Sequence, residues 1–391
     1  MNHARENRNP VEVSGFGQIA TFVIITVSAC QPSVAGSGAA GFLIIPVSAR
    51  AQGMGGAAIT LADEDAAFNN PAALGIFHLN RTFSLTSPTL YNGWLPSQAG
   101  DISMQYFALG VGKYPFFTLG DESNPLKVSV AVAYTRMRLG YGGFGTLNSP
   151  GTISSVRSPH DRAHSLNFGF AIERGVRIGF GFSAQFVKSS LVELLPGSGM
   201  SPGSSQGFTS KIGFMVELPL FRSPHSSWDI TPVVAHVRTL INGDMNFVSA
   251  FVAEPIVQIR KSAVGLLVVH QSRGRQHYSL RLVYERESAG GEIRDTHLNR
   301  FGAEAGLYNM IFVRMGKFKD SPVDRNIATY GFGIRLRGFL DLLAGSLGPE
   351  SAESSKSFGD KLDVRIDFSR YTGNLIETLS GTNFLRLTAS F

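Results

Sequence analysis

The sequence predicts an all-β fold: a transmembrane antiparallel β-barrel of about 14 strands with a short helical N-terminal plug in its lumen. Three observations lead to this prediction. Large apolar residues alternate with small or polar residues over many segments of strand length. Only 16% of the 391 residues are charged, against about 25% in an average soluble domain, and no apolar window is long enough for a membrane helix. The chain also ends in an alternating segment closed by Phe391.

Residues 1–35 are expected to form a signal peptide. Two early arginines precede Ile19–Ala29, an apolar stretch that is too short to span a bilayer. Two processing sites stay open. Ser33–Ala35 fits a small-x-small cleavage site, whereas Val27–Cys30 resembles a lipobox, which would leave a lipid on Cys30.

Residues 36–80 interrupt the strand pattern and are expected to form the plug. Its three clustered glycines favour a tight turn, and Leu61–Phe68 is expected to form one or two helical turns. Asn70 can cap a following helix that has Pro71 at its first position. The residues of this plug motif are Gly53, Gly55, Gly56, Asp63, Asp65, Asn70, Pro71 and Ala72.

An acidic run, Asp63-Glu64-Asp65, lies inside this segment. In a barrel lumen we expect these carboxylates to pair with arginines or to lie at a helix N-terminus. Calcium is an alternative partner, but one turn of helix supplies too few ligands by itself.

Residues 81–391 are expected to form the barrel. In one segment Leu166, Phe168 and Phe170 alternate with Asn167 and Gly169. Similar alternation covers 126–135, 176–183, 212–218, 278–285, 330–337 and 362–368. The second face is too small and glycine-rich for a soluble surface, so we expect the large apolar face to meet lipid and the other face to line the lumen.

Two sets of side chains refine this prediction. Aromatic residues near strand ends suit interfacial girdles: Tyr106, Phe107, Tyr114, Tyr134, Tyr278, Tyr284, Tyr308 and Tyr371. Charged residues on the small face are expected to pair inside a wet lumen: Arg177, Arg281, Glu285, Arg335, Asp363, Arg365 and Asp367. A closed barrel satisfies every backbone polar group within lipid, which explains the low charge without a hydrophobic helix.

Loops are expected where serine, glycine and proline gather. These stretches are Gly140–Pro159, Leu195–Gly207, Ser288–His297 and Leu347–Ser357. Arg337–Leu347 fits either a short helical turn or a strand continuation. A gap in strand pairing could arise at Gly110 and Gly112 with Pro115, or at Pro88, although a proline at a strand end is the plainer interpretation.

The last segment, Asn383–Phe391, places Leu385, Leu387 and Phe391 on one face. It resembles the terminal strand of bacterial outer-membrane barrels, in which the final Phe belongs to the signal that the barrel-insertion machinery reads. The alternative is a soluble edge strand that ends on Phe.

The segment Ala49–Leu74 resembles the start of the PorV/PorQ family of outer-membrane proteins, which is related to the long-chain fatty-acid transporters (FadL-type). The resemblance implies a bacterial outer-membrane location and a 14-stranded barrel with the N-terminal segment in its lumen. FadL-type members pass hydrophobic small molecules, which leave through an opening in the wall, and such a role predicts an apolar pocket in the lumen beside Ala49–Phe77. PorV-like members serve protein secretion by the type IX system, and such a role predicts function in the loops and a partner surface, with no apolar pocket. The expected partners are therefore outer-membrane lipid, the insertion machinery, and either a hydrophobic ligand or secretion-system proteins.

No catalytic, cofactor or metal site is expected, and the protein is expected not to be an enzyme. The GxGxxG match at Gly140–Gly145 opens no helix, and His160 and His164 lie at a loop-to-strand junction. A barrel-embedded hydrolase with a Ser/His pair on adjacent strands is a minor alternative. The net charge of +6 is spread along the chain, which excludes a nucleic-acid binder that tracks phosphates.

Overall fold

The computed structural model describes residues 40–87, 103–120, 125–140, 144–147, 153–157, 160–190, 205–220, 228–247, 252–272, 275–290, 296–320, 325–340, 362–371 and 383–391. The chain divides into two compact units, Met1–Val34 and Ala35–Phe391, and every described residue belongs to the second. The expected signal peptide, including Cys30, lies outside the described residues, as does Pro88.

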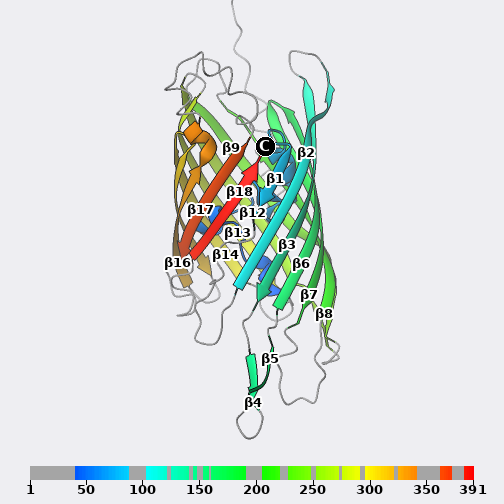
Figure 1. Ribbon diagram of the computed structural model, residues 1–391. Coiled ribbons are helices and arrows are strands. Elements are labelled where there is room, and N and C mark those ends of the chain that lie inside the picture. Colours follow the sequence, from blue (N-terminus) through cyan, green and yellow to red (C-terminus); the bar gives the residue numbers. More distant parts are fainter. Residues whose placement is uncertain are drawn as a thin grey trace, which may run out of the picture. The chain divides into compact units, whose positions relative to one another are not determined.

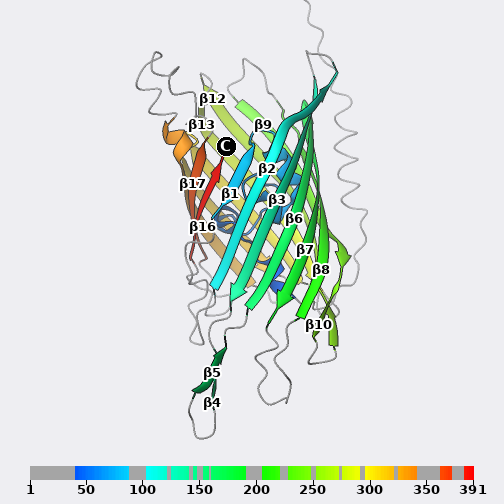
Figure 2. The same ribbon diagram turned by 45° about the vertical axis from the view of Figure 1, so that its right-hand side comes forward.

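Fourteen strands form one closed antiparallel barrel, which confirms the predicted fold class. They are β1 (Phe83–Thr86), β2 (Ser103–Leu119), β3 (Leu126–Gly140), β6 (His160–Arg174), β7 (Val176–Ser189), β8 (Ser205–Glu217), β9 (Trp228–Asn242), β12 (Gln258–Ser272), β13 (Arg275–Gly290), β14 (Thr296–Leu307), β15 (Ile311–Asp320), β16 (Arg325–Arg335), β17 (Asp363–Tyr371) and β18 (Asn383–Ser390). Each strand pairs with the next along the chain, and β1 closes the ring between β18 and β2 (Figure 1). Figure 2 shows the tilted wall of β2, β3, β6, β7 and β8.

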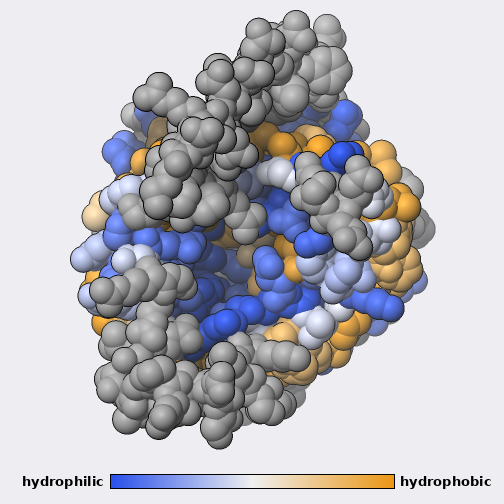
Figure 3. Space-filling view, turned by 90° about the horizontal axis from the view of Figure 1, so that it is seen from above, coloured by the Kyte–Doolittle hydropathy of each residue, from blue (hydrophilic) through white to orange (hydrophobic). Residues whose placement is uncertain are grey.

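The strands present their large apolar side chains outward, as expected for a membrane barrel. Phe168 is 44% exposed, whereas its neighbour Asn167 is 1% exposed and faces the lumen. Seen from the end of the barrel that carries the C-terminus, hydrophilic residues surround a hollow centre and hydrophobic residues lie outside them (Figure 3). Two of the expected girdle aromatics are exceptions: Tyr106 is fully buried, and the Tyr114 hydroxyl donates to Glu173 at 2.6 Å.

The two ends of the barrel differ in their connections. At the end that carries Phe391, β6 and β7 are joined by a turn at Gly175, and Tyr308–Met310 join β14 to β15. The opposite end, called here the loop end, carries two hairpins outside the barrel: β4 (Phe144–Leu147) with β5 (Ile153–Arg157), and β10 (Asp244–Phe247) with β11 (Val252–Pro255). Short turns beside the C-terminus are typical of outer-membrane barrels, although the β16–β17 connection at this end spans 27 residues, 336–362.

Three expected loops are partly strand. The stretch 140–159 contains the β4–β5 hairpin, β8 already begins at Ser205, and 288–297 includes the ends of β13 and β14. Backbone pairing with a neighbouring strand continues beyond the point where apolar alternation fades. Of the stretch 337–347, the described part 337–340 is helical, and 347–357 lies outside the described residues.

Four short helical segments lie within the ring of strands (Figure 1). They are η2 (Gly41–Ile44, a 3-10 helix), α2 (Ala49–Gly53), α3 (Ala66–Asn69) and α4 (Pro71–Phe77). Together with their connections, residues 40–79, they are called the plug below. The prediction of a helix over 61–68 is wrong for 61–65, because α3 begins only at Ala66. The carboxylates of Asp63, Glu64 and Asp65 contact arginines. No helix in the described ranges has the length and apolar character to cross a bilayer.

Candidate functional site

A closed ring of six alternating charges joins the plug to the barrel wall. Its members, in order around the ring, are Arg50, Asp63, Arg365, Asp367, Arg314 and Glu304. On the plug side, Arg50 of α2 contacts Glu304 of β14 at 2.5 Å and Asp63 at 3.1 Å. Asp63 lies 3.8 Å from Arg365 of β17. Each of these side chains is at most 9% exposed, so the pairs are held in a water-poor environment.

The wall supplies the other half of the ring. Arg365 contacts Asp367 two residues along β17 at 2.7 Å, and Asp367 contacts Arg314 of β15 at 2.7 Å. Arg314 then contacts Glu304 at 2.6 Å. Side chains of β14, β15 and β17 therefore close the ring around two plug residues, Arg50 and Asp63.

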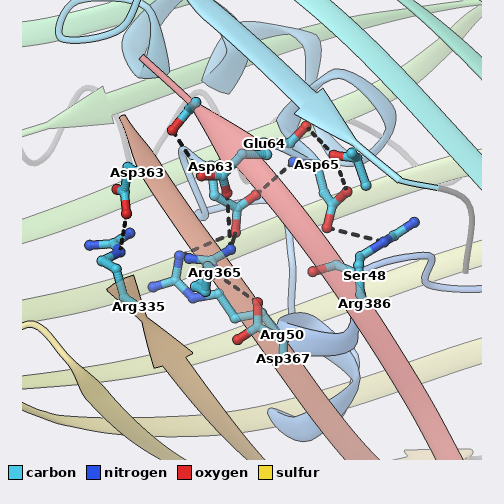
Figure 4. Close-up of polar contacts among 12 residues, drawn as sticks. Ser48, Arg50, Asp63, Glu64, Asp65, Arg335, Asp363, Arg365, Asp367 and Arg386 are labelled. Atoms are coloured by element: carbon cyan, nitrogen blue, oxygen red, sulfur yellow. Dashed lines mark hydrogen bonds and ion pairs between the residues drawn. The ribbon is translucent and has the colours of Figure 1, made fainter. Parts of the chain in front are cut away.

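The remaining plug carboxylates also bind wall arginines (Figure 4). Glu64 contacts Arg365 at 3.0 Å and accepts a hydrogen bond from Ser390 at 3.3 Å. Asp65 contacts Arg386 of β18 at 3.1 Å. The expected pairing of this acidic run with lumen arginines is thus present in the structure.

Burial dominates the electrostatics of one plug carboxylate. It raises the pKa of Asp63 to about 6, while the Arg50 and Arg365 guanidiniums act in the opposite direction. The nearby Asp65 and Glu64 raise it further. The charge of Asp63 therefore responds to mild acidification.

The glycine turn after α2 packs on the inner wall of β14–β16. Gly55 and Gly56 have φ values of 70° and 78°, the left-handed region in which glycine is favoured. Gly55 donates its N–H to the Thr329 hydroxyl at 2.8 Å, and that hydroxyl donates to the Gly53 carbonyl at 3.1 Å. A single wall threonine thus holds both ends of the turn.

The Asn-Pro-Ala run forms the start of α4 as predicted. The Asn70 side chain accepts a hydrogen bond from the Ala72 N–H at 3.0 Å, and its amide donates to the Ile59 carbonyl at 2.9 Å. Pro71 takes the first helical position. Asn70 therefore caps α4 and ties it to the preceding part of the plug.

Lumen glycines give α4 its seat on β6, β7 and β8. A Cβ on Gly181 would overlap the backbone of Pro71, and one on Gly169 would overlap the backbone of Gly75. A Cβ on Gly213 would overlap the Asn70 side chain. The small inner face of these strands is therefore where helix and wall approach backbone to backbone.

Much of the loop end of the lumen is apolar, and the buried Lys261–Glu287–Arg300 pairs lie at the same level on β12–β14. The plug side chains Phe42, Leu43, Val47 and Phe68 are buried there against inward-facing wall residues. These wall residues include Met104, Tyr106, Met137, Leu139, Ala163, Val187, Ile259, Phe318, Ile327 and Phe384. Plug and wall residues together are called the apolar lumen cluster. Sequence reasoning expected an apolar pocket beside the plug, and the structure has an apolar lining that the plug's own side chains fill.

The closing seam of the barrel lies beside this cluster. β1 pairs with β18 over Ser84–Thr86 and with β2 over Phe83–Thr86, the shortest ladders of the described barrel. Of the expected kinks, β2 does shift register between Lys113 and Phe117, around Pro115. Gly110 and Gly112 do not interrupt pairing; they leave room for the His78 ring.

Phe391 lies where the chain closes on itself. Its N–H donates to the Phe83 carbonyl at 3.1 Å, and its own carbonyl accepts from the Thr82 and Phe83 N–H groups. The Phe391 and Phe83 rings stack at 4.9 Å. Its expected role as an insertion signal stays a prediction.

Sequence reasoning missed many members of the charged lumen, among them Arg50, Glu304, Arg314 and Arg386, and the Lys261, Glu287 and Arg300 pairs. The signal for the wall members is a charged residue on the small face of an alternating segment, as in Arg386 between Leu385 and Leu387. Arg50 carries no such signal, because the plug has no strand period.

No family model and no curated protein matches this chain. Among solved structures, it is similar to the P. putida toluene transporter TodX at 12% identity and a TM-score of 0.40, covering 92% of this chain and 96% of that chain. The Ralstonia pickettii toluene transporter TbuX matches at 14% identity and 0.39, covering 89% and 97%. A Pseudomonas aeruginosa FadL homologue matches at 14% identity and 0.35, covering 88% and 95%. At such values no function can be transferred to this chain, and the PorV/PorQ resemblance stays a prediction.

Proposed function

We propose that this chain is a bacterial outer-membrane barrel that admits hydrophobic small molecules, with the plug acting as a hatch. The observation that carries the proposal is the apolar lumen cluster. A barrel lumen filled with water is ordinarily polar, yet here much of its loop end is lined by apolar side chains. Such a lining gains free energy only when an apolar group covers it.

The plug supplies that group in the present state. Phe42 and Leu43 are each 3% exposed and belong to η2, a single short turn. Burial of side chains of this size contributes about 1.5–3 kcal/mol each, an amount that an incoming apolar ligand can replace. A ligand would therefore exchange with η2, while the charged ring keeps α2 in place.

The seam at β1 offers a lateral route. Seven ladder pairs, three to β18 and four to β2, join β1 to its neighbours. Opening this seam would break fewer backbone hydrogen bonds than opening elsewhere in the described barrel. A hydrophobic compound could thus pass from the cluster into the membrane along the edge of the charged zone, where the Thr86 hydroxyl of β1 contacts Asp65 at 3.4 Å.

The alternatives have less support. A PorV-like secretion role places function in the loops and a partner surface and predicts no apolar pocket, so it gives no reason for the apolar lining of the wall. Ser/His contacts do occur between strands, as His236 with Ser262 at 2.9 Å and His297 with Ser288 at 3.0 Å. Both use the Nδ1 atom, and no described carboxylate or amide holds the other ring nitrogen, so we assign no catalytic activity.

Native mass spectrometry of the refolded barrel with a panel of fatty acids and monoaromatic compounds tests the proposal. Wild type is expected to retain at least one compound class, and Phe42→Ala/Leu43→Ala to retain it at least about tenfold more tightly, because the competing side chains are gone. Ala163→Phe, which fills the cluster, should reduce retention, whereas outward Leu166→Phe should not. The heat-dependent gel shift verifies folding of each variant. No retained compound in wild type and the double variant would overturn the proposal.

A further inference from the structure

We propose that the outer wall of β12–β16 holds one membrane lipid whose phosphate headgroup has a net negative charge, with an acyl chain in a groove and the phosphate on cations beside it. The site lies on the membrane-facing side, away from the lumen. It rests on the barrel's place in a membrane and is independent of whether compounds pass through the lumen.

The groove has a volume of about 800 Å³, within the range of small-molecule sites. Ala303 and Ala328 leave the space, and larger apolar side chains border it. Those borders are exposed outward: Val264 54%, Leu282 44%, Phe301 55% and Met315 65%. Exposed apolar walls of this size match a hydrocarbon chain.

The plug closes the inner side of this wall. Behind the groove, Gly302 and Gly316 pack directly on Met54, so that a Cβ on Gly302 would lie 2.6 Å from the Met54 Cβ. The groove therefore opens only toward the membrane. This separates its occupant from any compound in the apolar lumen cluster.

Cations lie at the loop end of the groove. Lys317 is part of the lining, and the next row of outward residues contains Arg286, Asn299 and Lys319, paired across β13, β14 and β15. Arg286, Lys317 and Lys319 are exposed. Within the described ranges, the side chains of Arg286 and Lys317 form no ion pair, and the row carries no carboxylate. Two or three cations around one anionic group suit a phosphate, which arginine can bind through two N–H groups.

The depth of this row fits a lipid headgroup. On β13, Tyr278 lies in an outward aromatic cluster with Trp228, His270 and Tyr308 at the C-terminal end of the barrel. Arg286 is eight residues further along the strand, about 27 Å at about 3.4 Å per residue. With a tilt of about 40° this corresponds to about 20 Å of depth, close to the apolar band of about 25 Å in outer-membrane barrels. The aromatic cluster and the cation row thus mark the two boundaries of the bilayer, and the row meets headgroups of the loop-end leaflet.

The test uses the full barrel in phosphatidylcholine nanodiscs that contain a minor fraction of diphosphorylated lipid A. After transfer to detergent, native mass spectrometry counts retained lipid. We expect one lipid A per barrel, and loss of at least about tenfold in retention for Arg286→Gln/Lys317→Gln/Lys319→Gln. Lys113→Gln/Lys188→Gln/Arg370→Gln removes the same charge from exposed sites outside the groove and should retain the lipid.

Ala328→Trp fills the groove but keeps every cation, and should also reduce retention. Added inorganic phosphate should not displace the lipid, because it cannot occupy the groove. Equal retention of phosphatidylcholine, equal loss in both triple variants, or unchanged retention by Ala328→Trp would each overturn the proposal. A negative result for lipid A on the outer wall would not change the expected ligand retention in the lumen, so the two proposals are tested separately.

Discussion

At the scale of single residues, the charged ring depends on every member having two partners. Arg365 is the most connected, because it contacts Asp63, Glu64 and Asp367. Replacing it leaves three carboxylates in a buried site with fewer cations. Removal of one partner from a buried pair costs about 3–5 kcal/mol.

Arg365→Met is therefore expected to lower the free energy of unfolding by about 3–5 kcal/mol, measured by urea titration of the barrel in lipid vesicles. Arg370→Met is the matched control, since Arg370 is on the same strand and exposed outward. It should change the free energy by less than about 0.5 kcal/mol. Equal effects of the two substitutions would contradict the assigned role of the ring.

Asp63 makes part of the stability dependent on pH. Burial raises its pKa from 3.8 to about 6, so the folded state holds a proton that the unfolded state releases in this window. Stability relative to Asp63→Asn should therefore fall as pH rises through this window, by up to about 1.4 kcal/mol per pH unit, and stay level on either side. Urea titrations of both proteins across pH 4–7 measure this difference, and a rise with pH would show the carboxylate to be stabilised by its arginines.

One residue shows where sequence patterns mislead. A large aromatic on an alternating strand predicts an outward position, yet Tyr106 faces inward, where its ring meets Phe68 at 5.6 Å and the Arg386 guanidinium at 4.6 Å. The prediction assumes that only small or polar side chains face the lumen. It fails at Tyr106 because the plug offers a large ring something to pack against.

At the scale of elements, α4 packs closely on the wall because the wall residues at the contact are glycines, which meet the backbone of the helix. Gly181 lies under Pro71, and Gly169 lies under Gly75. Gly181→Ala is expected to lower the free energy of unfolding by about 1–3 kcal/mol, because its Cβ overlaps backbone that cannot rotate away.

Gly265→Ala is the matched control, because Gly265 also faces the plug, on β12. A Cβ there would meet Leu282 and Thr60 at 3.4–3.5 Å, which is ordinary contact. Urea midpoints and protease sensitivity of the plug would separate the two variants. Identical behaviour would mean that α4 is not seated as described.

The strands were predictable because period two needs only local sequence, and the Asn70 cap was predictable for the same reason. The partners of the plug were not. Glycines on a lumen face show that something comes close, but no local pattern shows that α4 covers Gly169 while Met54 covers Gly302. Such pairings join residues more than 90 positions apart and depend on barrel closure.

At the scale of the whole molecule, the lumen changes character along its axis. Charged side chains such as Arg335 with Asp363 lie toward the C-terminal end, and the six-membered ring lies between. The apolar lumen cluster lies at the loop end, beside the charged group of Lys261, Glu287 and Arg300 on β12–β14. The plug spans these zones with one chain: η2 in the apolar zone and α2 at the ring. This arrangement allows one part of the plug to move while the other stays fixed.

The central claim is that a hydrophobic ligand replaces η2 while the ring holds the rest of the plug. A single-cysteine labelling experiment tests it most directly, using Leu43→Cys in a Cys30→Ser background and Ala73→Cys in α4 as the control. Both native side chains are buried, at 3% and 0% exposure, so maleimide labelling should be slow without ligand. With a retained ligand from the panel, we expect labelling at residue 43 to accelerate at least about tenfold and labelling at residue 73 to stay slow. Unchanged protection of residue 43 in a barrel that demonstrably holds ligand would contradict the account.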